Sequence, residues 1–199
     1  MDDTYKTVVT PAEGYINEKK SKFISYIYPV KSADEALGLV EELRVKYHDA
    51  RHVCWAYMLG WEREEFRAND DGEPSGTAGR PILGQINSAE LTDVLIAVVR
   101  YFGGTLLGTG GLIRAYKEAA ADAIANAEVV EKTVDDFIDI HFEYPLLNEV
   151  MRVLKQFDEV KWTQDFTESC RMRLQVRRSL SDRLQGMLSA IHGIDLAGV

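Results

Sequence analysis

Apolar residues alternate with polar ones in some parts of the chain and recur every three to four positions in others. The first pattern and runs of aromatic and β-branched residues predict strands over residues 5–10, 23–30 and 53–60. A nearly continuous apolar run predicts a buried strand over residues 93–102. The second pattern predicts helices over residues 33–47, 80–88 and 112–127. Segments rich in glycine, proline and charge are expected to be loops, and they cover residues 11–20 and 69–79.

Beyond a linker expected at residues 128–133, the same two patterns return in another order. They predict a strand at residues 138–142, a helix at 145–157 and a pair of strands at 160–166 and 170–178. A last helix is predicted at residues 180–191, with a possible short strand after it. The order is that of the ferredoxin-like split βαβ pattern. We therefore expect an α+β protein with two domains, 1–130 and 131–199.

The charge of the chain limits the ways in which it could bind nucleic acid. The net charge is −9, and residues 1–130 hold 14 basic against 20 acidic residues. Binding driven by overall positive charge is therefore excluded, and any contact with nucleic acid needs a local basic patch. Lys19, Lys20 and Lys22 form one small basic cluster, although surface lysines are common.

No stretch of the sequence is apolar and long enough for a membrane span or a signal peptide. Cys54 and Cys170 lie far apart, and no Cys-x-x-Cys pair is present. We therefore expect a cytoplasmic protein with reduced thiols and no membrane contact. The oligomeric state cannot be inferred from the sequence.

A glycine-rich segment joins the predicted strand 93–102 to the predicted helix 112–127. It begins with Arg100 and includes Gly103, Gly104 and Gly108, and the helix that follows holds Arg114. Free amides at the start of a helix can bind an anion, and flanking cations would strengthen such binding. The spacing matches neither of the common nucleotide-binding glycine motifs. A tight turn that allows close helix–sheet packing is the alternative.

The polar loop at residues 69–79 is the second candidate. Asp70, Asp71 and Glu73 could hold a hard cation such as magnesium, and Ser75 and Thr77 could bind phosphate. The spacing is not that of an EF-hand. The alternative is a turn-forming loop whose carboxylates accept hydrogen bonds from backbone amides.

Two weaker patterns remain. His52 and Cys54 would share one face of a strand, which is compatible with an activated thiolate but more typical of packing. In the strand 170–178, alternation directs a basic stripe outward, made by Arg171, Arg173 and Arg177. The stripe could bind phosphates, or it could be balanced by carboxylates on neighbouring strands, with candidates Asp135, Asp139, Asp165 and Glu168.

Several separated motifs together resemble the YigZ/IMPACT family over residues 5–127. They are Ser21–Phe23, His52–Tyr57, Asp70–Gly79, Arg80–Leu83, Arg100–Gly104 and Leu107–Gly108. The C-terminal part resembles the extra ferredoxin-like domain of bacterial members. The resemblance implies a first domain like domain 2 of a small-subunit ribosomal protein and domain IV of elongation factor G, and a second like domain V of that factor.

The resemblance also implies a role in translation, because eukaryotic IMPACT restrains the amino-acid-starvation kinase pathway. Our leading hypothesis is a non-enzymatic regulator that binds RNA, the ribosome or a translation partner. The expected phosphate- or nucleic-acid-binding residues are Lys22, Arg80, Arg100, Gly103, Gly104, Gly108, Arg114, Arg171, Arg173 and Arg177. The expected functional loop comprises Asp70, Asp71, Gly72, Glu73, Ser75, Gly76 and Thr77.

Two other functions stay open at this point. One is a metal-dependent phosphotransferase or hydrolase that uses Asp70, Asp71 and Glu73. The other is an adaptor that binds only proteins. The family has no settled catalytic residues, so none is assigned, and we expect neither a cofactor nor a resident metal.

Overall fold

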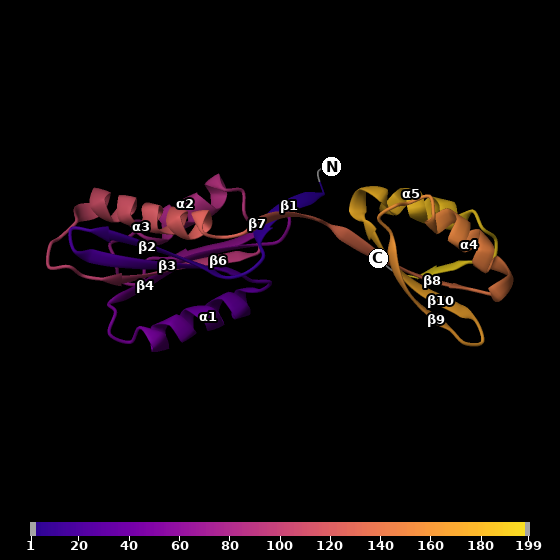
Figure 1. The fold of residues 1–199 in the computed structure, drawn as a ribbon, viewed down its shortest axis with the longest axis horizontal. Helices are drawn as coiled ribbons and strands as arrows, with labels where there is room; N and C mark the ends of the chain where they lie inside the picture. The colour runs from indigo at the N-terminus through magenta and orange to yellow at the C-terminus, as the bar shows by residue number, and fades with distance from the viewer. Residues whose placement is uncertain (1–2, 198–199) are drawn as a thin grey trace. The chain divides into compact units, whose positions relative to one another are not determined.

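A computed structural model describes residues 3–197 and separates the chain into two compact units (Figure 1). Domain one comprises Tyr5–Lys132. Domain two comprises Thr133–Val199 together with Met1–Thr4, as far as these residues are described. The expected α+β class and the expected two-domain layout are confirmed. No helix within residues 3–197 is long and apolar enough to cross a membrane.

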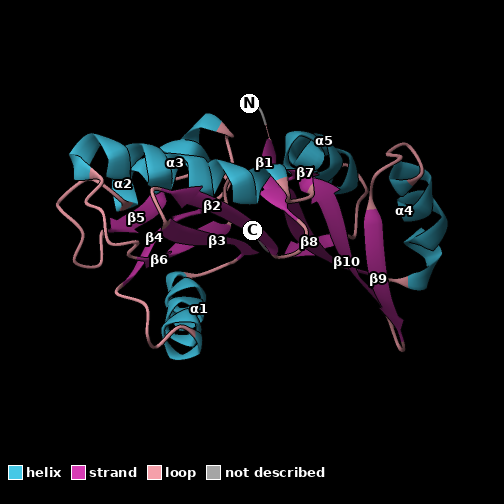
Figure 2. Ribbon diagram, turned by 60° about the vertical axis from the view of Figure 1, so that its left-hand side comes forward, coloured by secondary structure: helices cyan, strands magenta, loops and turns pink. Residues whose placement is uncertain are grey.

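An antiparallel five-stranded sheet forms the centre of domain one. In spatial order its strands are β2 (Ala12–Glu18), β3 (Ser21–Pro29), β6 (Val94–Tyr101), β4 (His52–Leu59) and β5 (Glu65–Asn69). Two helices, α2 (Gly79–Ser88) and α3 (Gly108–Ala125), cover one face, and α1 (Ala33–Lys46) covers the other (Figures 1 and 2). A separate small sheet pairs β1 (Thr4–Val8) with β7 (Val129–Thr133).

The central strand β6 has helices on both faces, which explains its nearly continuous apolar sequence. Ile96 and Val98 belong to the core beneath α2 and α3, whereas Leu95, Ala97 and Val99 belong to the core beneath α1. All five side chains are completely buried. The strand therefore joins two hydrophobic cores.

Alanines let α3 approach the sheet closely. Ala115, Ala119 and Ala123 recur along its buried face. A Cβ atom at Gly14 of β2 would lie 2.5 Å from the backbone nitrogen of Ala123, so this close approach requires glycine. The alanines that predicted a helix from the sequence thus also let α3 lie close to the edge strand β2.

The structure corrects three expectations in domain one. Residues 11–20 were expected to form a loop but contain β2, and residues 65–69 form the unexpected edge strand β5. The expected linker 128–133 contains β7. These strands are short or lie at edges, so much of each is exposed and their sequences lack a strong apolar pattern.

Domain two contains an antiparallel four-stranded sheet, covered on one face by helices (Figure 2). Its strands, in spatial order, are β11 (Asp195–Ala197), β8 (Asp135–Phe142), β10 (Cys170–Arg177) and β9 (Lys161–Phe166). Its helices are η1 (Tyr144–Leu146), α4 (Leu147–Leu154) and α5 (Arg178–Ser189). With the strands counted along the domain, the order is fourth, first, third, second, which is the ferredoxin-like arrangement.

Candidate functional site

Three of the family-like motifs meet at one end of the domain-one sheet. There β3 begins, β6 ends and β4 begins. Lys22 lies opposite Tyr101, and Arg100 lies opposite both Phe23 and His52. Sheet pairing therefore brings together residues that are separated by about thirty to eighty positions in the sequence.

The loop between β5 and α2 reaches the same end, and its first carboxylate caps α2. Asp70 accepts hydrogen bonds from the amides of Gly76, Ala78 and Gly79 at 2.8, 3.1 and 2.8 Å. Burial opposes ionisation of Asp70, but these amides outweigh it and hold its pKa below the ordinary value. Asp70 therefore satisfies the start of α2, as expected of a turn-forming loop.

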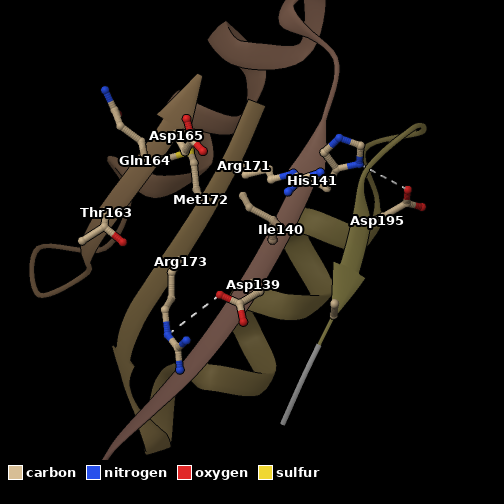
Figure 3. A pocket seen from close by; sticks show the side chains of 11 residues that line it. Asp139, Ile140, His141, Thr163, Gln164, Asp165, Arg171, Met172, Arg173 and Asp195 are labelled. Atoms are coloured by element: carbon tan, nitrogen blue, oxygen red, sulfur yellow. Dashed lines mark ion pairs between the residues drawn. The ribbon is translucent and has the colours of Figure 1, made fainter. Parts of the chain in front are cut away.

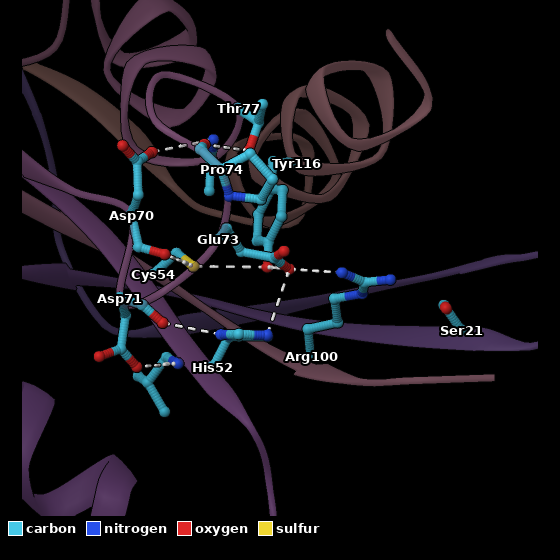
Figure 4. Close-up of polar contacts among 12 residues, drawn as sticks. Ser21, His52, Cys54, Asp70, Asp71, Glu73, Pro74, Thr77, Arg100 and Tyr116 are labelled. Atoms are coloured by element: carbon cyan, nitrogen blue, oxygen red, sulfur yellow. Dashed lines mark hydrogen bonds and ion pairs between the residues drawn. The ribbon is translucent and has the colours of Figure 1, made fainter. Parts of the chain in front are cut away.

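Asp71 attaches the loop to the sheet. Its carboxylate accepts hydrogen bonds from the amide of Val53 at 2.7 Å and from the guanidinium of Arg44 at 2.9 Å. Its carbonyl oxygen lies 2.7 Å from Nδ1 of His52. All the polar groups of Asp71 that face the sheet are therefore engaged by the protein (Figure 4).

Glu73 is the centre of a buried polar network. Its side chain is 4% exposed, and its Oε1 accepts hydrogen bonds from Nη1 of Arg100 at 2.6 Å and from the hydroxyl of Tyr116 at 2.7 Å (Figure 4). The Cys54 thiol donates to the carbonyl oxygen of Asp70 at 3.0 Å. Burial raises the pKa of this thiol, so the structure gives no activated thiolate here.

These contacts bear on the expectation that the loop could hold a metal ion. The carboxylates of Asp70, Asp71 and Glu73 each serve a different internal partner and do not converge on one point. Within residues 3–197 no group of three or more potential ligands is arranged to hold a metal ion. The geometry therefore gives no basis for a magnesium site formed by the three carboxylates.

Arg100 does not lie on the surface as expected of a phosphate-binding residue. Its side chain is 7% exposed and forms the buried ion pair with Glu73. Its guanidinium carbon lies 5.5 Å from the ring centroid of Phe23 and 5.9 Å from that of Phe102. Arg100 therefore fixes the end of the sheet from within, because β6 turns this side chain towards α3.

The glycine segment that follows β6 is anchored at its first residue and open thereafter. Gly103 donates a hydrogen bond to Oγ of Ser21 at 3.1 Å, and a Cβ atom at Gly103 would lie only 2.1 Å from the carbonyl carbon of Lys20. Gly104 and Gly108 take positive φ angles of 88° and 71° and face open space. Among the described residues no side chain accepts a hydrogen bond at the start of α3, whereas Asp70 does so for α2.

Exposed cations adjoin this open segment. The backbone of Lys20 lies against Gly103, Lys22 pairs in register with Tyr101, and the guanidinium carbon of Arg51 lies 5.8 Å from the ring centroid of Phe102. Among the described residues these three cations make no ion pair. The same holds for three other exposed cations, which are Lys19 before β3, Arg80 in α2 and Arg114 in α3.

Some cations elsewhere in domain one do have acidic partners. Lys6 pairs with Glu90 at 2.8 Å, and Lys31 pairs with Asp93 at 2.5 Å. Two acidic residues also lie near the open segment, Glu18 at the end of β2 and Asp49, which accepts a hydrogen bond from Tyr101. The cations still outnumber these acids. The importance of Lys19, Lys20 and Arg51 was not predicted from the sequence, because sheet pairing is what brings them near Gly103.

The comparisons with known proteins agree with this arrangement of motifs. The model of the Impact N-terminal domain matches residues 19–124, which is more than half of the chain. The protein belongs to the IMPACT family. IMPACT family member YvyE of Bacillus subtilis (strain 168) is 36% identical over 156 residues, which are 78% of this chain and 72% of that protein. IMPACT family member YigZ of Escherichia coli (strain K12) is 37% identical over 142 residues, which are 70% of each chain.

A solved structure shows the same fold as this IMPACT-family chain. A crystal structure described as a hypothetical protein has 28% sequence identity and a TM-score of 0.73, and the match covers 100% of this chain and 98% of that one. The two-domain translational regulator Yih1 is 20% identical over 64% of this chain and 48% of its own, with a TM-score of 0.36. The second likeness is too slight to support a functional argument.

In domain two of this IMPACT-family protein, Arg177 is not free to bind phosphate. Its guanidinium donates to both carboxylate oxygens of Asp3, at distances from 2.7 to 3.0 Å. The amide of Ser179 donates to the same carboxylate at 2.9 Å. The guanidinium, aided by this amide, holds the pKa of Asp3 far below its ordinary value. Arg177 thus fastens the N-terminal segment to domain two.

The other two arginines of the stripe lie on the open sheet face, around a shallow pocket of about 350 Å³ (Figure 3). Arg173 lies 3.9 Å from a carboxylate oxygen of Asp139 and 5.1 Å from the ring centroid of Phe137. Arg171 lies opposite Asp165 and makes no ion pair with any residue that the structure describes. Because carboxylates line the pocket together with the arginines, the structure favours the balanced face over a uniformly basic one.

Proposed function

We propose that this protein is a regulator of translation that binds RNA, free or in the ribosome, through the exposed end of domain one at Gly103. Family membership supports the first part, because IMPACT proteins are known as translation regulators. The second part comes from the site itself. We call the surface formed by Lys19, Lys20, Lys22, Arg51 and the start of α3 the cationic end.

The observation that carries the proposal is that several exposed cations gather at this end and, within residues 3–197, make no ion pair, in a chain with a net charge of −9. Neighbouring like charges repel each other, and an external polyanion relieves that repulsion. The uncapped amides of α3 add hydrogen-bond donors that suit phosphate oxygens. The buried Glu73 carboxylate, which neutralises Arg100, is turned away from this surface.

No comparable observation favours a metal-dependent phosphotransferase or hydrolase. That function needs Asp70, Asp71 and Glu73 around one ion, whereas the protein itself uses each of them. The loop at residues 70–79 stabilises the strand ends next to the cationic end, because its residues form hydrogen bonds with His52 and Arg100.

A salt titration of RNA binding tests the proposal. The full chain is mixed with a fluorescently labelled structured RNA, and anisotropy is measured between about 50 and 200 mM salt. We expect log K to fall linearly with log salt, and the slope to be shallower in a Lys20→Gln/Lys22→Gln variant, by about 0.9 for each lost phosphate contact. Lys6→Gln is the matched control, because Lys6 is paired with Glu90 away from this end.

Two results would contradict the proposal. One is the absence of RNA binding by the wild-type chain at the lowest salt concentration. The other is an unchanged salt slope in the double variant, which would show that these lysines contact no phosphate. Thermal melting of each variant confirms that its fold is intact.

A further inference from the structure

Two large apolar side chains are exposed in the middle of the cationic end. Phe102 is 43% exposed and Leu106 is 84% exposed, and both lie in the segment between β6 and α3. Single exposed apolar residues are ordinary on protein surfaces. Here, however, the ring of Phe102 has guanidinium groups of Arg51 and Arg100 within 6 Å, at 5.8 and 5.9 Å.

We propose that this segment binds an unpaired base of RNA, so that the cationic end selects single-stranded or looped RNA over duplex RNA. This inference rests on the proposed function and names the form of RNA that the same surface takes. The exposed face of Phe102 stacks on the base, Leu106 packs beside it, and Lys20 and Lys22 contact the adjoining phosphates.

The chemistry of the surface favours an unpaired base over a duplex. A duplex presents phosphates and sugars on its outside and keeps the faces of its bases stacked inside the helix, so Phe102 and Leu106 would gain no partner. An unpaired base offers a π face for an aromatic ring or a guanidinium plane, with phosphates on either side. Apolar and cationic groups occur together here. Single-stranded RNA can contact both kinds of group, through its base and its phosphates.

The backbone around Phe102 is already held in position. Gly103 is fixed by its hydrogen bond to Ser21 and by close contact with Lys20. Arg100, on the other side of Phe102, is fixed by its ion pair with Glu73. The aromatic ring is thus presented from a constrained backbone, which reduces the entropy lost when a base binds. Arg51 is exposed and makes no ion pair within the described residues, so its guanidinium remains available to the same base.

The test compares three labelled RNA probes with equal numbers of phosphates: an unstructured single strand, a hairpin with a large loop, and a blunt duplex. We expect the wild-type chain to bind the single strand and the hairpin more tightly than the duplex. Phe102→Leu keeps an apolar side chain but removes the aromatic face. It should weaken single-strand binding by about fivefold or more and leave duplex binding within about twofold.

Phe66→Leu is the matched control, because Phe66 is also an exposed phenylalanine of domain one, 59% exposed on β5, and should not change binding of any probe. The inference is overturned if the wild-type chain binds the duplex as tightly as the single strand, or if Phe102→Leu binds all probes like the wild type. In either case a salt slope that depends on Lys20 and Lys22 would leave the proposed function standing. Failure of every probe to bind would overturn both.

Discussion

Replacement of Glu73 by glutamine should strongly destabilise domain one, although it changes few atoms. Oε1 of Glu73 accepts hydrogen bonds from both Arg100 and Tyr116. Glutamine has nearly the same shape and can still accept through its carbonyl oxygen. What it removes is the negative charge that faces the guanidinium of Arg100, which is 7% exposed.

The magnitude follows from the burial of the pair. Removing one partner of a buried ion pair costs about 3–5 kcal/mol, because the other charge remains buried without a counter-ion. Nε of Arg100 is also buried and has no hydrogen-bond partner within residues 3–197, so the side chain has little other compensation. Since glutamine keeps a hydrogen bond, we expect the lower end of the range, about 3 kcal/mol.

Native-state amide hydrogen exchange on the full chain is the suitable measurement. The two domains can unfold separately, so one global unfolding transition would not report on domain one. The amide of Val98, in the centre of β6, reports the opening of the domain-one core. A loss of about 3 kcal/mol corresponds to exchange that is more than about a hundredfold faster. Amides of β10 in domain two should be unaffected.

Glu90→Gln is the control, because it removes an exposed ion pair with Lys6 and should change stability little. The reasoning is refuted if Glu73→Gln accelerates exchange at Val98 no more than Glu90→Gln does. A double variant, Glu73→Gln with Arg100→Met, should recover much of the lost stability, because it removes the uncompensated charge as well.

Three further predictions concern other parts of the chain. Hydrogen bonds from Arg177 depress the pKa of Asp3 in the folded protein. The ionised Asp3 carboxylate therefore contributes fully to the stability of domain two above about pH 4, and this contribution is lost at lower pH. Calorimetry should show that Asp3→Asn melts at a lower temperature than the wild type at pH 7 and that the difference shrinks towards about pH 2. Burial raises the pKa of both cysteine thiols, and neither should react with a thiol reagent at pH 8 until the protein is unfolded by denaturant. Gly103→Ala should cost about 1–3 kcal/mol through its backbone clash, whereas Gly110→Ala, in open space within α3, should raise stability by up to about 1 kcal/mol in denaturant titrations.

Elements with a strong periodic pattern could be predicted from the sequence. The helix α1 begins after Ser32, whose hydroxyl accepts a hydrogen bond from the amide of Glu35 as the capping motif requires. In β10, alternation correctly placed Cys170, Met172 and Leu174 in the core. Local sequence carries these signals because burial of one face repeats at the period of the element.

Strands that depend on distant partners could not be predicted in the same way. The edge strand β2 contains Gly14, a residue unfavourable in strands, because α3 packs against it from more than one hundred positions away. Edge strand β5 is mostly exposed on both faces and shows no clear alternation. Their pairing is a property of the sheet and not of the local segments.

In the candidate site, too, some features could be predicted from local sequence and others depend on distant residues. A glycine segment followed by a helix was recognisable from composition, and the turn-forming alternative correctly described Asp70. The orientation of Arg100 was not recognisable, because the sequence does not show that Glu73 lies beneath it. For the same reason the sequence could not tell which cations would keep acidic partners and which would not.

The distribution of carboxylates explains how an acidic chain can present a cationic end. Of the acids in the neighbouring loop, Asp70 neutralises the start of α2, Asp71 binds Arg44 and a strand amide, and Glu73 is buried with Arg100. Each carboxylate is therefore engaged by a partner within domain one and stabilises the loop beside Arg100. If these carboxylates were exposed instead, they would oppose the nearby lysines and weaken attraction for a polyanion. The buried network and the exposed cations are thus two parts of one arrangement, in which the first makes the second available.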